Sequence, residues 1–281
     1  MNHDPFHWGR PSDATYGPYN HQIAHASNVN PMARQQQQSD FPTMHTQRPM
    51  MTGTSVLAIK YQDGIVIAAD NMGSYGSLMK LDNVERLLKV GQSTIVGISG
   101  DLSDLQAIQR ILNDLEIDEA YDAGDDEDTI AAGLKANHVH EYLTRILYNR
   151  RSKMDPLWNA CVVAGFDDEG KSFLKYVDLL GVAFASPTLA TGFGAHLAIP
   201  LLRQRVDSEA DVKNLTKADA IQLIKDCMKV LFYRDARSLD KYSMAVLSES
   251  DHKVEFHKNV KVEDMKWGFA KGIKGYGMPQ L

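Results

Sequence analysis

The feature that most constrains this chain is a turn signal that recurs between pairs of apolar, β-branched runs. The first signal is Asp63-Gly64, which links the run Ser55–Tyr61 to the run Gly64–Asp70 and is typical of a β-hairpin. The other pairs of runs are Arg86–Val90 with Thr94–Ser99, Ala160–Phe166 with Ser172–Val177, and Tyr242–Leu247 with Lys253–His257. The sequence therefore predicts a series of antiparallel strand pairs.

Apolar residues at helical spacing lie between these strand pairs. One helix is predicted by Leu105, Ile108, Leu112 and Leu115, and another by Leu134, Tyr142, Leu143, Ile146 and Leu147. A third carries Ile221, Ile224, Met228, Leu231 and Phe232 along one side. Thr216 followed by Asp219 is typical of a capped start for that third helix. We expect a shorter helix after Gly194, broken near Pro200.

The order of these elements favours an α+β fold with four layers. Antiparallel sheets must cover their apolar faces, so two stacked sheets with helices outside them satisfy the pattern. We expect this αββα sandwich over residues 46–261, with a head at residues 1–45 and a C-terminal extension at residues 262–281. The head is rich in Asn, Gln, His, Pro, Ser and Gly and has no periodicity, which indicates a disordered segment or propeptide.

Charge and cysteine content point to protein partners. A formal net charge of −6 disfavours general binding to nucleic acid or acidic membranes, because such binding needs a basic surface. The sequence has neither the apolar core of a signal peptide nor a run near the roughly 18 apolar residues of a membrane helix. Cys161 and Cys227 lie in apolar surroundings and are expected to be core residues rather than a disulfide or metal pair. We therefore expect a chain of the cytoplasm and nucleus.

Two charged stretches could suggest other functions. Residues 116–128 are dominated by Asp and Glu but lack the glycine turn of a calcium loop, so we expect a solvated acidic loop and no metal. A basic cluster closes the second predicted helix, where cations stabilise the negative end of the helix dipole. It consists of Arg145, Arg150, Arg151 and Lys153. We prefer this helix-end role, with or without a protein contact, to a nucleic-acid patch.

The dipeptide Gly53-Thr54, just before the first hairpin, carries the candidate chemistry. If the chain were cut between these residues, Thr54 would present a hydroxyl nucleophile and an α-amine with an ordinary pKa of about 8. The amine could then act as the general base for the hydroxyl. The dipeptide alone is weak evidence, because Gly-Thr also stands at the start of ordinary strands.

Longer segments place Thr54 in a recognisable context. Thr54–Asp70 reads TSVLAIKYQDGIVIAAD, Val96–Asp104 reads VGISGDLSD, and Tyr233–Ser238 reads YRDARS. Together they resemble the beta subunits of the 20S proteasome, which are N-terminal nucleophile hydrolases, and the resemblance runs from residue 46 onward. Further segments most resemble the family's non-catalytic seventh beta subunit, called beta type-7 in fungi and beta type-4 in animals. They are Asn71–Lys80, Arg150–Ala160, Ser186–His196 and Met265–Gly277.

The resemblance implies roles for individual positions. In active family members, a threonine at the position of Thr54 is the nucleophile and an aspartate matches Asp70. A glycine matching Gly100 contributes a backbone N–H to the oxyanion hole. An aspartate and a serine matching Asp235 and Ser238 hold the threonine amine in a hydrogen-bond network. All of these residue types are present in this chain.

Two positions depart from the pattern of active members. Arg86 stands where active members have a lysine, and a guanidinium is bulkier, planar and permanently protonated. Phe193, in the segment Gly192-Phe193-Gly194, puts an apolar ring where active members have a network serine. Residues that act as a unit lose most of their activity when one of them is replaced. We therefore expect the catalytic set to be vestigial.

The expected processing site supports the same interpretation. In the resembled subunit the propeptide is cut upstream of the glycine, which corresponds here to His45-Thr46 and leaves Thr46–Gly53 attached. Thr54 would then carry an amide nitrogen, which cannot act as a base.

Structural roles are accordingly favoured for the remaining matched residues. We expect Asp70 to pair with Arg86, and Asp235 with Ser238 to fix the turn after the third helix. Gly100 and the glycines of residues 192–194 are expected to serve positive φ or close approach of the backbone.

The C-terminal extension mixes Trp267, Phe269 and Tyr276 with lysines and glycines, a composition common at protein interfaces. The resemblance implies that this extension reaches the opposite beta ring, between its first and second beta subunits. An extension packed on its own domain is the alternative.

The sequence thus predicts a non-catalytic structural subunit of the 20S beta ring, in contact with alpha and beta subunits. It would support the joining of half-particles and the ATP- and ubiquitin-dependent degradation carried out by the complex, and no cofactor is expected. An active threonine-type endopeptidase with Thr54 as nucleophile is the alternative. A free-standing binding module on the same sandwich is a third possibility.

Overall fold

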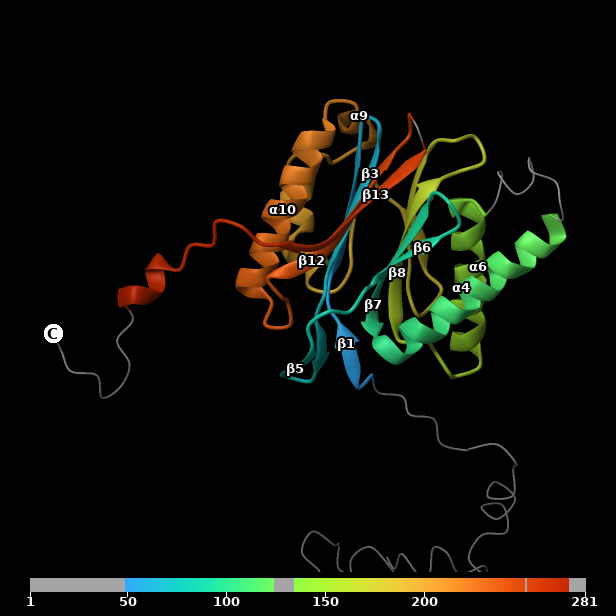
Figure 1. The fold of residues 1–281 in the computed structure, drawn as a ribbon, viewed down its shortest axis with the longest axis horizontal. Coiled ribbons are helices and arrows are strands. Elements are labelled where there is room, and N and C mark those ends of the chain that lie inside the picture. Colours follow the sequence, from blue (N-terminus) through green and yellow to red (C-terminus); the bar gives the residue numbers. More distant parts are fainter. Residues whose placement is uncertain (1–48, 124–133, 251, 273–281) are drawn as a thin grey trace, which may run out of the picture. The chain divides into compact units, whose positions relative to one another are not determined.

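The computed structural model describes residues 49–123, 134–250 and 252–272. The predicted head at residues 1–45 lies outside these residues, as do residues 124–128 of the predicted acidic loop. Within the described residues the strands form two antiparallel sheets, with helices on the outer face of each sheet (Figure 1).

The larger sheet has eight strands in the described part of the chain, in the order β10-β9-β8-β7-β1-β4-β5, and β6 pairs with β7. Its strands are β1 (Met51–Gly53), β4 (Gly73–Tyr75), β5 (Leu78–Leu81), β6 (Leu87–Val90), β7 (Thr94–Asp101), β8 (Asn159–Phe166), β9 (Ser172–Val177) and β10 (Ala183–Ala185). The smaller sheet has the order β11-β2-β3-β12-β13. Its strands are β2 (Val56–Tyr61), β3 (Gly64–Asp70), β11 (Thr188–Ala190), β12 (Lys241–Ser248) and β13 (Lys253–Lys261).

Helices α4 (Leu102–Ala123) and α6 (Ala136–Ser152) cover the larger sheet, and α10 (Lys217–Arg234) covers the smaller one (Figure 1). The short helices are α7 (Gly194–Leu197), α8 (Ile199–Arg203), α9 (Glu209–Val212) and the 3-10 turn η2 (Gly268–Gly272). Pro200 lies in the first turn of α8, so the predicted break in this region is confirmed. The predicted αββα sandwich is likewise confirmed.

Three apolar layers hold the sandwich together, one between the sheets and one under each set of helices. Alternation along β2 shows why the strand reads as a continuous apolar run. Val56 and Ala58 lie in the layer between the sheets, whereas Leu57 and Ile59 lie in the layer under α10. A strand buried on both faces has no polar side to interrupt its sequence.

The predicted strand pairs and the three long helices are all present, but several shorter strands were not predicted. β1, β4, β5, β10 and β11 were not recognised as strands, and β1 shows that order begins before Thr54. The prediction of an acidic loop over residues 116–128 is wrong for its first part, because α4 continues to Ala123. Glu has a high helix propensity, and the Glu116 carboxylate accepts a hydrogen bond from the N–H of Gly91 at 2.5 Å.

The cysteines and the ends of two long helices agree with the sequence predictions. Cys161 and Cys227 are buried and free, and Arg150 and Arg151 lie in the last turn of α6. The side chain of Thr216 caps α10 by accepting a hydrogen bond from the N–H of Asp219. No helix among the described residues combines the length and apolar character needed to cross a membrane.

Gly97 marks a close approach of the two sheets and gives a test of their packing. A Cβ placed on Gly97 would lie 2.6 Å from Cγ1 of Val56 and 3.0 Å from Cδ1 of Ile67. We expect Gly97→Ala to lower the free energy of unfolding by about 1–3 kcal/mol through overpacking, measured as a shift of the urea midpoint. Gly268→Ala is the control, because a Cβ there would meet no described atom within 4 Å. Equal midpoints for the two variants would contradict the packing described.

Candidate functional site

The chain leading to Thr54 is an inner strand of the larger sheet. β1 lies between β4 and β7, with Thr52 opposite Ser74 on one side and Gly53 opposite Gly100 on the other. The Ser74 hydroxyl also donates to the carbonyl oxygen of Thr52 at 3.2 Å. The N–H of Met50 donates to a carboxylate oxygen of Asp101 at 3.1 Å. Both backbone edges of this short strand are therefore occupied, and Thr54 follows directly from it.

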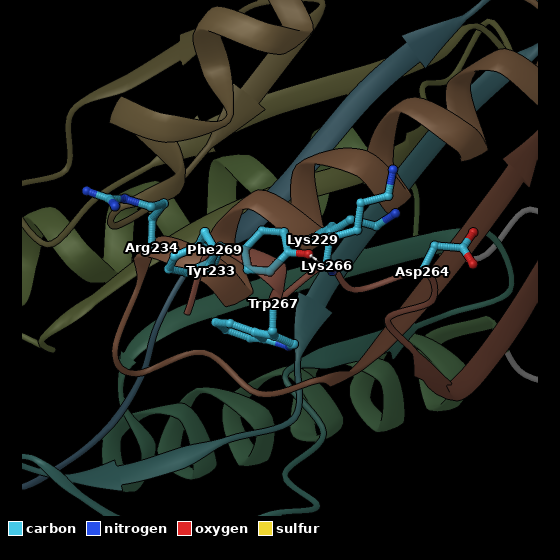
Figure 2. A pocket seen from close by; sticks show the side chains of 7 residues that line it. All are labelled: Lys229, Tyr233, Arg234, Asp264, Lys266, Trp267 and Phe269. Carbon is cyan, nitrogen blue, oxygen red and sulfur yellow. Dashed lines mark hydrogen bonds between the residues drawn. The ribbon is translucent and has the colours of Figure 1, made fainter. Parts of the chain in front are cut away.

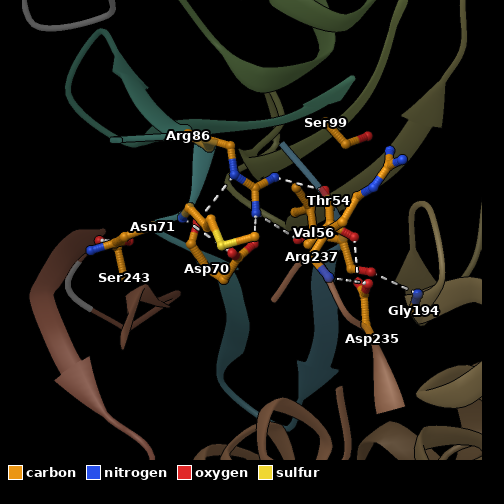
Figure 3. Close-up of polar contacts among 12 residues, drawn as sticks. Thr54, Val56, Asp70, Asn71, Arg86, Ser99, Gly194, Asp235, Arg237 and Ser243 are labelled. Atoms are coloured by element: carbon orange, nitrogen blue, oxygen red, sulfur yellow. Dashed lines mark hydrogen bonds and ion pairs between the residues drawn. The ribbon is translucent and has the colours of Figure 1, made fainter. Parts of the chain in front are cut away.

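The hydroxyl of Thr54 is held by a carboxylate that follows α10. Thr54 Oγ1 donates to Asp235 Oδ2 at 2.5 Å. The other oxygen of Asp235 accepts the N–H of Arg237 at 2.9 Å, and the N–H of Asp235 donates to the carbonyl of Leu231 at 2.7 Å. Asp235 is thus fixed by the helix end and the following turn (Figure 3).

Ser238 lies in the same turn, where its N–H donates to the carbonyl of Asp235 at 3.2 Å. Its hydroxyl oxygen is buried and has no hydrogen-bond partner among the described protein atoms. Asp235 and Ser238 therefore belong to one turn beside Thr54, although only Asp235 contacts its hydroxyl.

Arg86 is almost fully buried, at 1% exposure, and joins three strands at this site. Its Nη1 donates to the carbonyls of Thr54 at 2.7 Å and Ile98 at 3.2 Å. Its Nη2 donates to the carbonyl of Ser55 at 3.0 Å and forms an ion pair with the Asp70 carboxylate. Its Nε donates to the carbonyl of Asp70 at 3.0 Å. A guanidinium has five N–H donors, and these contacts use all five. Figure 3 shows Arg86 beside Thr54 and Asp70.

Asp70, at the end of β3, is the charge partner of Arg86 and is equally buried. One of its carboxylate oxygens accepts the N–H of Met72 at 3.1 Å. Burial raises the pKa of Asp70 above its ordinary value, while the charge of Arg86 and the hydrogen bond from Met72 act in the opposite direction. The pairing of Asp70 with Arg86 that the sequence suggested is present.

Glycines shape the backbone around Thr54. Gly100 has a φ of 96°, and a Cβ on it would lie 2.0 Å from the carbonyl oxygen of Trp158. Gly192 has a φ of 57°. The N–H of Gly194 donates to the hydroxyl of Ser55 at 2.8 Å. Gly100 and Gly192 thus have the positive φ expected of these glycines, and Gly100 also allows a close approach of the backbone.

Phe193 lies between the last two of these glycines, and its side chain is 58% exposed. An exposed phenyl ring offers no hydroxyl to orient a nucleophile. The polar contact to this segment comes instead from Ser55.

The arrangement presents one hydroxyl, on Thr54, oriented by the carboxylate of Asp235. With Gly53 attached, the nitrogen of Thr54 is an amide and has no lone pair available as a base. The nearby cation is a guanidinium whose donors all point at fixed acceptors, so it cannot exchange a proton at neutral pH.

Some predicted residues lie away from this cluster or outside the described residues. His45, Thr46 and Tyr276 are outside them. Trp267 packs edge-on against Tyr233 of α10, with ring centroids 5.1 Å apart, and Phe269 is 70% exposed. The start of the C-terminal extension therefore contacts its own domain.

Three residues that were not predicted hold the strands next to Thr54. Ser74 and Asp101 anchor β1, and the hydroxyl of Thr191 accepts the N–H of Val56 at 2.8 Å. Asp101 also accepts the N–H groups of Ser103 and Asp104 in the first turn of α4, at 2.8 and 3.1 Å. Asp-Leu-Ser-Asp before a helical pattern was an N-cap signal that could have identified Asp101.

Comparison with known proteins gives a consistent result. The family profile described as "Proteasome subunit" matches residues 50–247. The chain is 52% identical to the proteasome subunit beta type-7 of Saccharomyces cerevisiae, over 100% of both chains. It is 44% identical to the probable proteasome subunit beta type-7 of Schizosaccharomyces pombe, over 96% of this chain and 95% of the relative. It is 46% identical to the proteasome subunit beta type-4 of Xenopus laevis, over 84% of this chain and 92% of the relative.

The Arg86–Asp70 pair gives a test of the site with a pH-dependent readout. Arg86→Met removes one partner of a buried ion pair and should lower the free energy of unfolding at pH 7 by about 3–5 kcal/mol. Without the arginine charge, burial raises the pKa of Asp70 further, so the folded variant binds its proton more tightly than the unfolded chain. The loss in free energy of unfolding, relative to the unaltered chain, should then be smallest below about pH 4, the ordinary carboxyl range. This deficit should grow as pH rises through the pKa of Asp70 in the folded variant.

Urea denaturation across a pH series measures this deficit. The control is Arg86→Met combined with Asp70→Asn, whose deficit should not change with pH over the same range because the titrating group is gone. A deficit in Arg86→Met that is equal at every pH would show that Asp70 does not depend on Arg86.

Proposed function

Because the chain belongs to the proteasome subunit family, with beta-type subunits among its relatives, we propose that it is a non-catalytic structural member of the 20S beta ring. The observation that carries this proposal is the position of β1, which pairs Gly53, the residue before Thr54, inside the larger sheet. A catalytic threonine of this type needs a free α-amine. The pairing of β1 inside the sheet supports a Thr54 that stays joined to Gly53 and has no free α-amine.

Loss of β1 would have structural consequences for the larger sheet. In the strand order, β4 and β5 connect to the rest of the sheet through β1. Cleavage between Gly53 and Thr54 would break the covalent link between β1 and the rest of the chain. The β4–β5 hairpin would then be joined to the larger sheet only through a detached peptide. We infer that processing occurs upstream, near His45-Thr46, and that Thr46–Gly53 remains part of the mature subunit.

The close contact between Arg86 and Gly53 also supports processing upstream of Gly53. A Cβ on Gly53 would lie 2.3 Å from Cδ of Arg86, so the arginine side chain lies directly against the residue before Thr54. The same arginine donates to the carbonyl of Thr54. This position therefore fixes the backbone around Thr54, whereas the smaller lysine of active family members would leave room and an exchangeable proton.

The role that follows is assembly. The chain would occupy one place in the beta ring, between beta neighbours and against an alpha subunit, in the cytoplasm and nucleus. Its C-terminal extension would contact the first and second beta subunits of the opposite ring and help to join half-particles. Degradation of ubiquitin-tagged proteins would belong to the whole complex, with peptide hydrolysis carried out by other subunits.

An active threonine-type endopeptidase is the second candidate, and one observation favours it. The Thr54 hydroxyl and Asp235 are 2.5 Å apart, which is the contact that an oriented nucleophile would need. Asp70, Gly100 and Ser238 are also retained. This candidate requires a cut at Gly53-Thr54.

The mature N-terminus separates the two candidates. We expect intact-mass and N-terminal analysis of the subunit, purified from assembled particles, to show a start upstream of Thr54, close to Thr46. A threonine-directed covalent inhibitor should leave this subunit unlabelled, because the amide nitrogen cannot activate the hydroxyl. The catalytic subunits of the same particles are the internal control for labelling. A start at Thr54 together with its labelling would overturn the non-catalytic proposal.

The assembly role predicts an effect of shortening the C-terminal extension. Deletion of residues 266–281 spares Val262 and Met265, which pack against the core under α10. We expect the truncated subunit to enter half-particles but to shift the sedimentation profile from complete particles toward half-particles. Full-length chain expressed at the same level is the control. Complete particles at normal yield and stability would mean that the extension does not join the rings.

A further inference from the structure

A pocket with a volume of about 540 Å³ lies where the C-terminal extension meets the end of α10. Helix α10 contributes Lys229, Tyr233 and Arg234, and the residues after β13 contribute Asp264, Lys266, Trp267 and Phe269. Figure 2 shows Arg234 at one end and Asp264 at the other, with the rings of Tyr233 and Trp267 between them. The two walls come from segments far apart in the sequence.

The aromatic wall of the pocket is built from fixed contacts. The N–H of Lys266 donates to the hydroxyl of Tyr233 at 2.5 Å. The ring of Trp267 packs edge-on against Tyr233 and Phe232, with centroids 5.1 and 6.2 Å apart, and lies 6.1 Å from Phe269. Even so, Trp267 remains 46% exposed. Half-exposed aromatic side chains on an anchored segment form a surface that another apolar group can cover.

Positive charge surrounds this wall. Among the described residues, the side chains of Lys229, Arg234 and Lys266 form no ion pair, and Asp264 is the single carboxylate lining the pocket. Arg234 and Lys229 near the end of α10 offset the negative end of the helix dipole. Lys266 belongs to the extension, so the dipole gives no reason for its position. The lining therefore carries a positive excess available to an outside group.

We propose that this pocket receives an acidic peptide segment of a neighbouring subunit. An apolar side chain of that segment would lie against Trp267 and Phe269, and its carboxylates would pair with Arg234 and Lys266. The proposal rests on the proposed function, because it takes the partner to be another subunit of the assembled particle.

The chemistry of the pocket favours a carboxylate-bearing peptide over a phosphate ligand. Phosphates are typically held by backbone N–H groups at a helix N-terminus. This pocket lies at the opposite end of α10, where the dipole is negative and repels a concentrated polyanion. Carboxylates spaced along a peptide can instead meet separate cations, such as Arg234 and Lys266. The aromatic rings then supply the apolar contact.

Photocrosslinking in assembled particles tests the proposal. Phe269 is replaced by benzoylphenylalanine, which keeps an aromatic ring at an exposed position of the pocket, and the crosslinked peptide is identified by mass spectrometry. We expect a single major crosslink to a neighbouring subunit, within a segment that contains at least two acidic residues close to an apolar one. Arg234→Glu with Lys266→Glu should lower the crosslink yield at least about fivefold, since both counter-charges become repulsive.

A matched pair of charge reversals controls for net charge. Lys89 and Arg110 are exposed and lie outside the pocket, so Lys89→Glu with Arg110→Glu makes the same change in charge and should leave the yield unaltered. Crosslinks confined to the chain itself, crosslinks to a neutral or basic segment, or a yield indifferent to the pocket reversals would each overturn the proposal. In all of these cases the chain is in the particle, so its proposed place in the beta ring stands. Absence of the unmodified chain from particles would contradict both.

Discussion

One buried guanidinium holds the corner where the two sheets meet. Arg86 reaches the residues just before β2 through Thr54 and Ser55, the end of β3 through Asp70, and β7 through Ile98. These segments belong to strands of both sheets or lead into them. Each contributes a carbonyl oxygen to which Arg86 donates a hydrogen bond. An unsatisfied buried acceptor costs about 1–3 kcal/mol, so a single side chain that satisfies several is a strong constraint on local geometry. The position of Thr54 follows from this constraint as much as from its own hydrogen bond to Asp235.

Local patterns in the sequence were sufficient for most of the fold. The Asp63-Gly64 turn fixed one hairpin, and the Thr216 cap fixed the start of α10, because each depends on residues close together in the chain. β1 could not be found in this way. It has three residues, no alternation, and partners in β4 and β7 that only the folded chain brings beside it.

The functional site likewise combines residues that could be predicted from the sequence with contacts that could not. The resemblance identified Thr54, Asp70, Arg86, Gly100, Phe193, Asp235 and Ser238, and the Asp70–Arg86 pair was anticipated from charge. The other four acceptors of Arg86 were not, because they are backbone carbonyls whose positions the sequence does not reveal. For the same reason the pocket beside α10 was missed, since its walls are defined by the path of the chain after β13.

The inner position of β1 also dictates an order of events during synthesis. β1 leaves the ribosome before either of its neighbours, so it must stay unpaired until β4 and then β7 have been made. Closing such non-local pairs costs loop entropy before any contact repays it, which slows folding. Until β7 has been made, the nascent chain therefore exposes an edge of β1 that other chains could pair with.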